Sequence, residues 1–189
     1  RYNLWKSNGT PIGTVLVKDI YAGSGSTSFG DFHNANGILF FVGSDGVNGS
    51  ELWKSNGTDA GTIMIKDIET GTGGSNIRRF VTLNSNTYFF ANTAATGNGL
   101  WKTDGTDAGT VIVKDLNDNG SPDYLTLVGN ILFFRGFDDT NGAELWKSDG
   151  TEAGTVLVKD IFPGVSDGYP VNLFNANGTL YFSASNEAK

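Results

Sequence analysis

The four tryptophans of the chain stand at equivalent places in a repeated motif, and each could serve as a binding platform. They follow a leucine every time, in the tetrapeptides LWKS, LWKS, LWKT and LWKS. An exposed indole face stacks well on a sugar ring or another apolar ligand. A residue found once in every repeat can equally pack between repeats. Both roles remain open for Trp5, Trp53, Trp101 and Trp146.

Two loops that precede such motifs carry the oxygen-rich side chains that a hard cation prefers. Asp45 and Glu51 bound one loop, and Asp138 and Glu144 bound the other. Carboxylate and amide oxygens around glycine-containing turns are the usual ligands of Ca²⁺. Neither loop has the full spacing of an EF-hand, and solvated turns explain the same residues without a metal. Calcium is therefore the one cofactor that the sequence suggests, with these four acids as its ligands.

The same glutamates have a structural alternative. If Ser55 pairs with Thr62 across a hairpin, the register places Glu51 opposite Lys66. The same offset applies to the repeat that contains Glu144. Opposite charges that face each other across a sheet contribute about 0.2 to 1 kcal/mol.

A third recurring group is an aspartate that follows a lysine in every repeat. Four such residues could hold a cation or water if their strands lined a channel. Each could instead accept a hydrogen bond from the glycine-rich loop that follows it. The residues are Asp19, Asp67, Asp115 and Asp160.

Catalytic patterns find little support. His33 is the only histidine, cysteine is absent, and no nucleophile, zinc or phosphate-loop motif is present. Pairs of carboxylates could act as acid and base, but nothing in the sequence selects one pair. We expect a protein that is not an enzyme.

The elements that must position these side chains repeat four times. The motif leucines stand at Leu4, Leu52, Leu100 and Leu145, in steps of 48, 48 and 45 residues. Such periods are typical of propellers, solenoids and arrays. We predict a single domain over residues 1–189. Its repeats span residues 37–85, 86–129 and 130–178, with the remaining repeat divided between 1–36 and 179–189.

Each repeat contains four short β-branched or aromatic runs separated by turn residues. In one repeat these runs are ILFFV, ELWKS, TIMIKDI and IRRFVTL. Four strands per repeat, without a helical period, predict an all-β chain folded as a four-bladed β-propeller. The C-terminal strand LYFSAS would pair with the N-terminal blade and close the ring. The alternative is a stretch of a longer array that begins and ends at the same phase of the repeat.

Composition narrows the classes of partner. Glycine supplies 27 of 189 residues, and the net charge is −7 with a pI near 4.5. An acidic chain lacks the basic face that nucleic acids and anionic membranes require. No apolar run approaches the roughly 20 residues that span a bilayer. We expect neither nucleic acid nor membrane insertion, and because residue 1 is Arg we expect a part of a longer chain.

The motif itself resembles that of the ELWxxDGT-repeat proteins. ELWKSDGT at 144–151 matches the name of the family, and related forms stand at 51, 100 and 4. The resemblance implies a bacterial exported or cell-surface protein with many repeats, and no established activity. Asn3 and Gly99 replace the motif glutamate, and Asn8 and Asn56 replace its aspartate, so a fourfold site made of those side chains is doubtful.

Repetition, polar loops of varied sequence and the lack of a catalytic pattern together favour a non-enzymatic binding or adhesion module. Its ligand would be a glycan or a protein of a cell surface. A structural module of a surface fibre that binds nothing is the alternative. A hydrolase is the third hypothesis.

Overall fold

The computed structural model describes residues 2–21, 25, 27–116 and 120–186. These residues form strands, turns and loops, and they include no helix that could cross a membrane. Contacts divide the chain into two compact units. The first comprises residues 1–78 and 105–110, and the second comprises residues 79–104 and 111–189.

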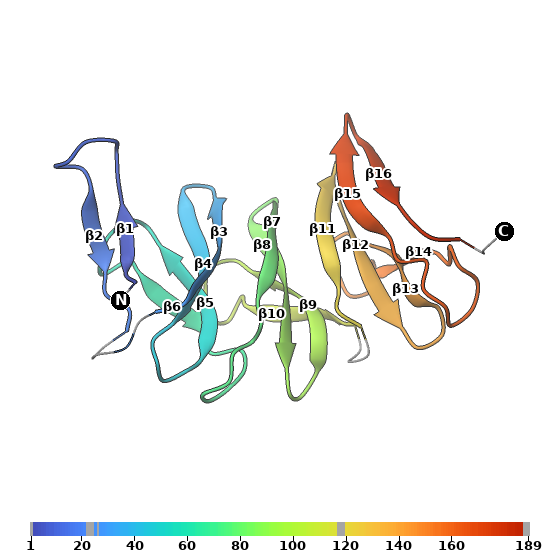
Figure 1. Cartoon of the computed structure of the whole chain (residues 1–189), viewed down its shortest axis with the longest axis horizontal. Coiled ribbons are helices and arrows are strands. Elements are labelled where there is room, and N and C mark those ends of the chain that lie inside the picture. Colours follow the sequence, from blue (N-terminus) through green and yellow to red (C-terminus); the bar gives the residue numbers. More distant parts are fainter. Residues whose placement is uncertain (1, 22–24, 26, 117–119, 187–189) are drawn as a thin grey trace. The chain divides into compact units, whose positions relative to one another are not determined.

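The strands of the first unit are short and antiparallel (Figure 1). They are β1 (Leu4–Lys6), β2 (Val15–Lys18), β3 (Phe29–Ala35), β4 (Ile38–Ser44), β5 (Ser50–Ser55) and β6 (Ile63–Lys66). Strands β3 to β6 form a four-stranded sheet in sequence order, whereas β1 and β2 form a two-stranded sheet.

The second unit contains two four-stranded sheets and one two-stranded sheet. Of the residues in these sheets, only Arg78, the first residue of β7, belongs to the first unit. The first sheet consists of β7 (Arg78–Leu83), β8 (Asn86–Thr93), β9 (Gly97–Thr103) and β10 (Val111–Asp115). The second consists of β11 (Asp123–Val128), β12 (Ile131–Asp138), β13 (Gly142–Ser148) and β14 (Val156–Lys159). The two-stranded sheet consists of β15 (Val171–Ala176) and β16 (Thr179–Ser183).

The prediction of an all-β chain of antiparallel strands is confirmed, and three of the sheets contain four strands each. The sheets are offset by one strand from the predicted repeats, because IRRFVTL, the last strand of the repeat 37–85, is β7 of the next sheet. The predicted closure of the ring is not among the described strand pairs. β1 pairs with β2 alone and β16 pairs with β15 alone, so the N-terminal and C-terminal pairs are both half-sheets. The four-bladed propeller stays a prediction.

A phenylalanine and the motif tryptophan are cross-strand partners in each complete sheet. The pairs are Phe41 with Trp53, Phe89 with Trp101 and Phe134 with Trp146. The three phenylalanines are fully buried and the three tryptophans nearly so. Apolar residues on both faces of these strands thus supply the core, as short buried strands require.

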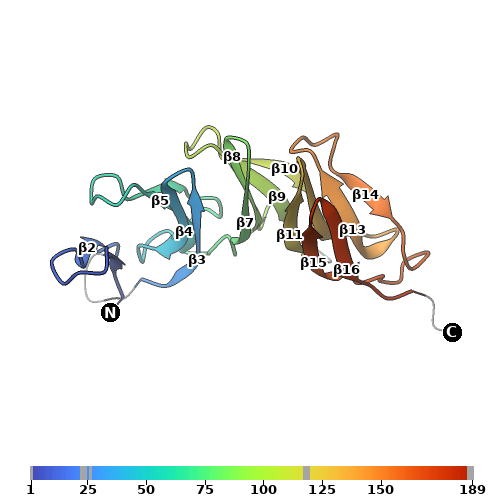
Figure 2. The ribbon, with the colours of Figure 1, turned by 90° about the horizontal axis from the view of Figure 1, so that it is seen from above.

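Each unit has its own hydrophobic cluster. In the first unit, Leu4, Val17 and Ile20 pack with Phe41 and Trp53. The second unit has a larger cluster, whose fully buried members are Phe90, Leu100, Leu132 and Phe134. Strand β15 lies beside β11 (Figures 1 and 2), and Asn175 Nδ2 donates to the Leu127 carbonyl at 2.9 Å.

The turn between β5 and β6 is fixed by hydroxyl and amide side chains. Ser55 Oγ and Thr62 Oγ1 lie 2.7 Å apart, as the predicted hairpin pairing requires. Asn56 Oδ1 accepts hydrogen bonds from the amide and hydroxyl of Thr58 at 3.0 and 2.7 Å. Gly57 has φ +84°, a left-handed conformation that favours glycine. The NGT and DGT motifs are therefore structural turns.

Lysines connect successive repeats within the first unit. Lys6 Nζ donates to the Gly57 carbonyl at 2.7 Å, and Lys54 Nζ donates to the Gly105 carbonyl at 2.6 Å. Lys66 Nζ lies 2.9 Å from Asp107 Oδ1. The recurring lysines of the motif hold the turn of the following repeat.

Candidate functional site

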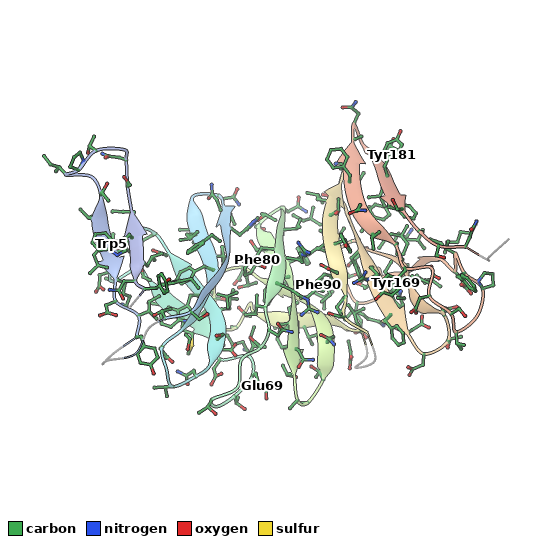
Figure 3. All side chains as sticks on the ribbon, in the orientation of Figure 1. Trp5, Glu69, Phe80, Phe90, Tyr169 and Tyr181 are labelled. Atoms are coloured by element: carbon green, nitrogen blue, oxygen red, sulfur yellow. The ribbon has the colours of Figure 1, made fainter. Side chains whose placement is uncertain are left out.

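The four tryptophans do not share one environment. Trp53, Trp101 and Trp146 are buried, and two of their rings stack on phenylalanines: Phe41–Trp53 at 6.3 Å and Phe134–Trp146 at 6.5 Å between centroids. These contacts correspond to the packing role. Trp5 in the N-terminal half-sheet is 58% exposed (Figure 3).

Trp5 also lines a cavity of about 360 Å³ in the first unit. The walls come from the β1–β2 half-sheet, from Leu39 on β4 and from the turn at Ser55–Gly57. The glycines at the same turn position of the next two complete sheets, Gly105 and Gly150, each lie against an aromatic ring. A Cβ atom placed on Gly105 would lie 3.5 Å from Phe40, and one on Gly150 would lie 2.2 Å from the Tyr88 hydroxyl.

The acidic loops are closed by their own hydrogen bonds. Asp45 Oδ1 accepts from the amides of Val47 and Asn48 at 2.8 and 2.9 Å. Asp138 Oδ1 accepts from the amides of Thr140 and Asn141 at 2.8 and 2.7 Å. Partial burial alone would raise the pKa of Asp45, but the hydrogen bonds from Asn48 and Val47 hold that pKa below its ordinary value.

The predicted partner of Glu51 is wrong. Lys66 pairs with Leu52, because a bulge between Leu52 and Trp53 shifts the register by one residue. The same bulge stands between Leu145 and Trp146, so Lys159 pairs with Leu145 and Glu144 is likewise displaced.

Both motif glutamates are fully buried. Each accepts hydrogen bonds from the loop that follows the last strand of its sheet, β6 or β14. Glu51 accepts from the Ile68 amide at 3.0 Å, and from the Ser75 amide and hydroxyl at 2.9 and 2.6 Å. Glu144 accepts from the amides of Ile161, Phe162 and Gly168 at 3.1, 3.2 and 2.7 Å. Burial raises the pKa of Glu51 to about 7, against the opposing effect of its hydrogen bonds.

The four acids predicted as calcium ligands all accept hydrogen bonds within the chain. Across the described residues, no three Asp, Glu, His or Cys side chains gather as a metal site would require. Asp45 and Glu51 each have hydrogen-bond donors of the chain within reach, as do Asp138 and Glu144. The calcium hypothesis stays a prediction.

Two of the four aspartates of the Lys-Asp motif, Asp67 and Asp160, accept hydrogen bonds from the loops that follow them. Asp67 Oδ2 accepts from the Gly71 amide at 3.4 Å, and Asp160 Oδ2 accepts from the Gly164 amide at 3.1 Å. This is the loop-capping role that the sequence left open. His33 lies on β3, where burial lowers its pKa.

The first strand of each complete sheet, and β15 of the C-terminal half-sheet, contains a residue with left-handed φ, which the sequence did not predict. Three of the four residues lie in the bulge where this strand shifts register against its neighbour, and Arg79 is the second residue of β7. The four residues are Asp31 at +43°, Arg79 at +61°, Tyr124 at +61° and Asn172 at +58°. Positive φ is uncommon outside glycine and is a strained conformation for Arg and Tyr.

Two of these residues belong to a charged and aromatic cluster in the second unit. Arg79 Nε donates to Asp123 Oδ1 at 2.5 Å, and its guanidinium lies 5.7 Å from the Tyr124 ring centroid. Arg135 lies 5.3 Å from the same centroid and 4.8 Å from that of Tyr169. Burial alone would raise the pKa of Asp123, but Arg79, the Tyr124 amide and Arg135 hold it below its ordinary value. No sequence spacing pointed to this cluster, because its members do not recur between repeats.

No protein-family model matches the chain, and a search of curated proteins finds no match. Function must therefore be inferred from the geometry.

Proposed function

We propose that the chain is a non-enzymatic binding or adhesion module of a bacterial exported or cell-surface protein. One observation carries the proposal: four equivalent positions on β3, β7, β11 and β15 share a left-handed backbone conformation but differ in chemistry. They present a carboxylate, a guanidinium, a phenol and an amide at Asp31, Arg79, Tyr124 and Asn172.

A constant backbone with varied side chains is what a recognition surface on a rigid scaffold requires. Packing alone does not explain it, because the packing positions carry the same residue types in every complete repeat. Strained backbone conformations also concentrate at functional sites. The ligand would be a glycan or a protein.

The proposed architecture is the four-bladed propeller. The three complete sheets would be three blades, and the half-sheets β15–β16 and β1–β2 would together make the fourth. The register of the complete sheets would set Phe182 opposite Trp5 and Tyr181 opposite Lys6. Tyr181, at the position of Phe40 and Tyr88, would then enter the cavity beside Gly57.

A structural module of a surface fibre is the second candidate. The observation in its favour is that both half-sheets leave apolar side chains accessible, with Trp5 58% and Tyr181 60% exposed (Figure 3). Neighbouring repeats of a longer chain could cover them, and the repeats would then supply length and stability. Electron microscopy of the parent protein separates the two: beads on a stalk fit a binding module, and an unbroken rod fits a fibre.

Arrays of glycans and of surface proteins test the leading proposal, with millimolar Ca²⁺ in one arm and a chelator in the other. Saturable binding that the substitution Tyr124→Ala weakens would support it. A signal no higher than that of an unrelated β protein in every arm would overturn it. A panel of glycosidic and ester substrates covers the third hypothesis, hydrolysis.

A further inference from the structure

A cavity of about 150 Å³ lies in the second unit, beside the charged and aromatic cluster. It is formed by the β12–β13 hairpin, by Gly120 and Ser121 before β11, and by Asp167 and Tyr169 before β15. Its functional side chains are those of Ser121, Arg135, Asp167 and Tyr169. The volume is below the roughly 300–1,000 Å³ of sites for drug-sized ligands, so the cavity suits a single sugar ring.

Tyr169 is held in place by its backbone and exposes its ring. Its amide donates to the Ala143 carbonyl at 2.9 Å, and its φ of +51° is a left-handed conformation that a tyrosine rarely adopts. The residue is 53% exposed, and Figure 3 shows it in the segment before β15. Arg135 covers part of this ring, and the part that stays exposed at the edge of the cavity can pack against the apolar face of a pyranose.

Arg135 has N–H donors that make no hydrogen bond to the described residues. Its side chain is 13% exposed, lies against the rings of Tyr124 and Tyr169, and has Nη2 3.9 Å from Asp123 Oδ2. Among the described residues its guanidinium makes one hydrogen bond, from Nη2 to the Ser121 carbonyl at 3.5 Å. A guanidinium has five N–H donors in a fixed plane, so most of them remain for a ligand.

Asp167 supplies the complementary acceptor at the same cavity. Its Oδ1 accepts from the Ala143 amide at 2.7 Å, which fixes the carboxylate, while no described residue donates to Oδ2. A ligand that accepts a hydrogen bond from Arg135 and donates one to Asp167 needs an acceptor oxygen next to a hydroxyl group. Vicinal hydroxyl groups have this property because each hydroxyl both donates and accepts.

The charges around the cavity select a neutral ligand. Arg79 and Arg135 carry two positive charges, and Asp123 and Asp167 carry two negative charges. An anion would gain from Arg135 but would meet the carboxylate of Asp167, whereas a neutral polyol meets no such cost.

We propose that this cavity binds one neutral pyranose residue of a glycan. The sugar packs against the part of the Tyr169 ring that Arg135 leaves uncovered, accepts hydrogen bonds from Arg135 and donates one to Asp167. This inference rests on the proposed binding function and names the class of ligand at one site.

Titration of the protein with methyl glycosides of neutral hexoses, followed by NMR shifts of backbone amides, tests the proposal. We expect saturable shifts at residues 135–143 and 167–169 with at least one neutral hexoside. Tyr169→Ala should weaken binding about tenfold, the change that corresponds to about 1.4 kcal/mol, while Tyr169→Phe keeps the ring and should stay within about threefold. Phe174→Ala, which removes a 66% exposed ring outside the cavity, is the matched control and should leave binding unchanged.

Three outcomes would overturn the proposal: no saturation by any neutral hexoside, tighter binding of glucuronate than of glucoside, or equal losses in Tyr169→Ala and Phe174→Ala. Thermal unfolding of each variant shows whether a loss reflects misfolding, and Arg135→Lys then provides a second test, with an expected loss of about tenfold. An array signal that survives Tyr169→Ala would contradict this site alone. Absence of any array signal would contradict the proposed function as well.

Discussion

Phe134 and Trp146 face each other across β12 and β13, with their ring centroids 6.5 Å apart. Phe41 and Trp53 repeat this relationship across β4 and β5. The two half-sheets contain the equivalent residues, Phe182 on β16 and Trp5 on β1, but these residues have no such partner in the described pairs. We therefore expect equivalent phenylalanines to contribute differently to the free energy of unfolding in complete sheets and in half-sheets.

Phe134→Ala should destabilise the protein far more than Phe182→Ala. Phe134 is fully buried, and removal of a buried phenylalanine ring costs about 3–5 kcal/mol. Phe182 is 38% exposed, so we expect a loss of about 1 kcal/mol or less if the half-sheets stay apart. Urea unfolding of the two variants gives the comparison. A large loss for Phe182→Ala would instead indicate that a partner covers β16 in solution.

Glu51 should make the free energy of unfolding depend on pH. Its pKa rises from the ordinary 4.5 to about 7 on folding, so the folded state favours the protonated side chain. The stabilising contribution is fully present below pH 4.5 and is lost as the pH rises through 7, with a total on the order of 3 kcal/mol. Glu51→Gln should remove this dependence. Parallel pH profiles of the two proteins would contradict the assignment.

The repeated elements were predictable from sequence because their signals are local. The Ser55–Thr62 pairing and the NGT turn follow from residue types a few positions apart. The inward turn of Glu51 was not predictable, since it depends on a bulge between Leu52 and Trp53 that no residue pattern marks. Arg135 and Tyr169 meet only through tertiary contacts, and neither recurs in other repeats. The repeats thus allowed the strands and turns to be predicted, but not the candidate site.

Two glycines with similar backbone conformation should respond differently to alanine. Gly49 has φ +73°, and a Cβ there would lie 1.6 Å from the Gly73 carbonyl oxygen. Gly9 has φ +87°, with nothing within 4 Å of such a Cβ. Gly9→Ala should cost only the left-handed strain, about 1–2 kcal/mol, and Gly49→Ala should cost more because backbone must also move. Thermal unfolding ranks them, and equal costs would show that the loop before β5 adapts freely.

A pair of cysteines provides a direct test of the fourth blade. The chain has no cysteine, so Lys6→Cys with Tyr181→Cys introduces the only possible disulfide. In the complete sheets the equivalent residues, Lys54 with Phe40 and Lys102 with Tyr88, are cross-strand partners. Cross-strand Cα atoms lie about 4.5–5.5 Å apart, within the range that a disulfide spans.

If the half-sheets complete one blade within a chain, mild oxidation should yield a disulfide-bonded monomer that migrates faster than its reduced form on denaturing gels. Lys6→Cys with Thr179→Cys shifts the second position by two residues out of this register, and it should oxidise more slowly. Disulfide-bonded dimers would show that the strands pair between copies, which contradicts a ring closed by its own chain. Free thiols throughout would contradict any pairing of β1 with β16, because a correct register places both cysteines within bonding distance.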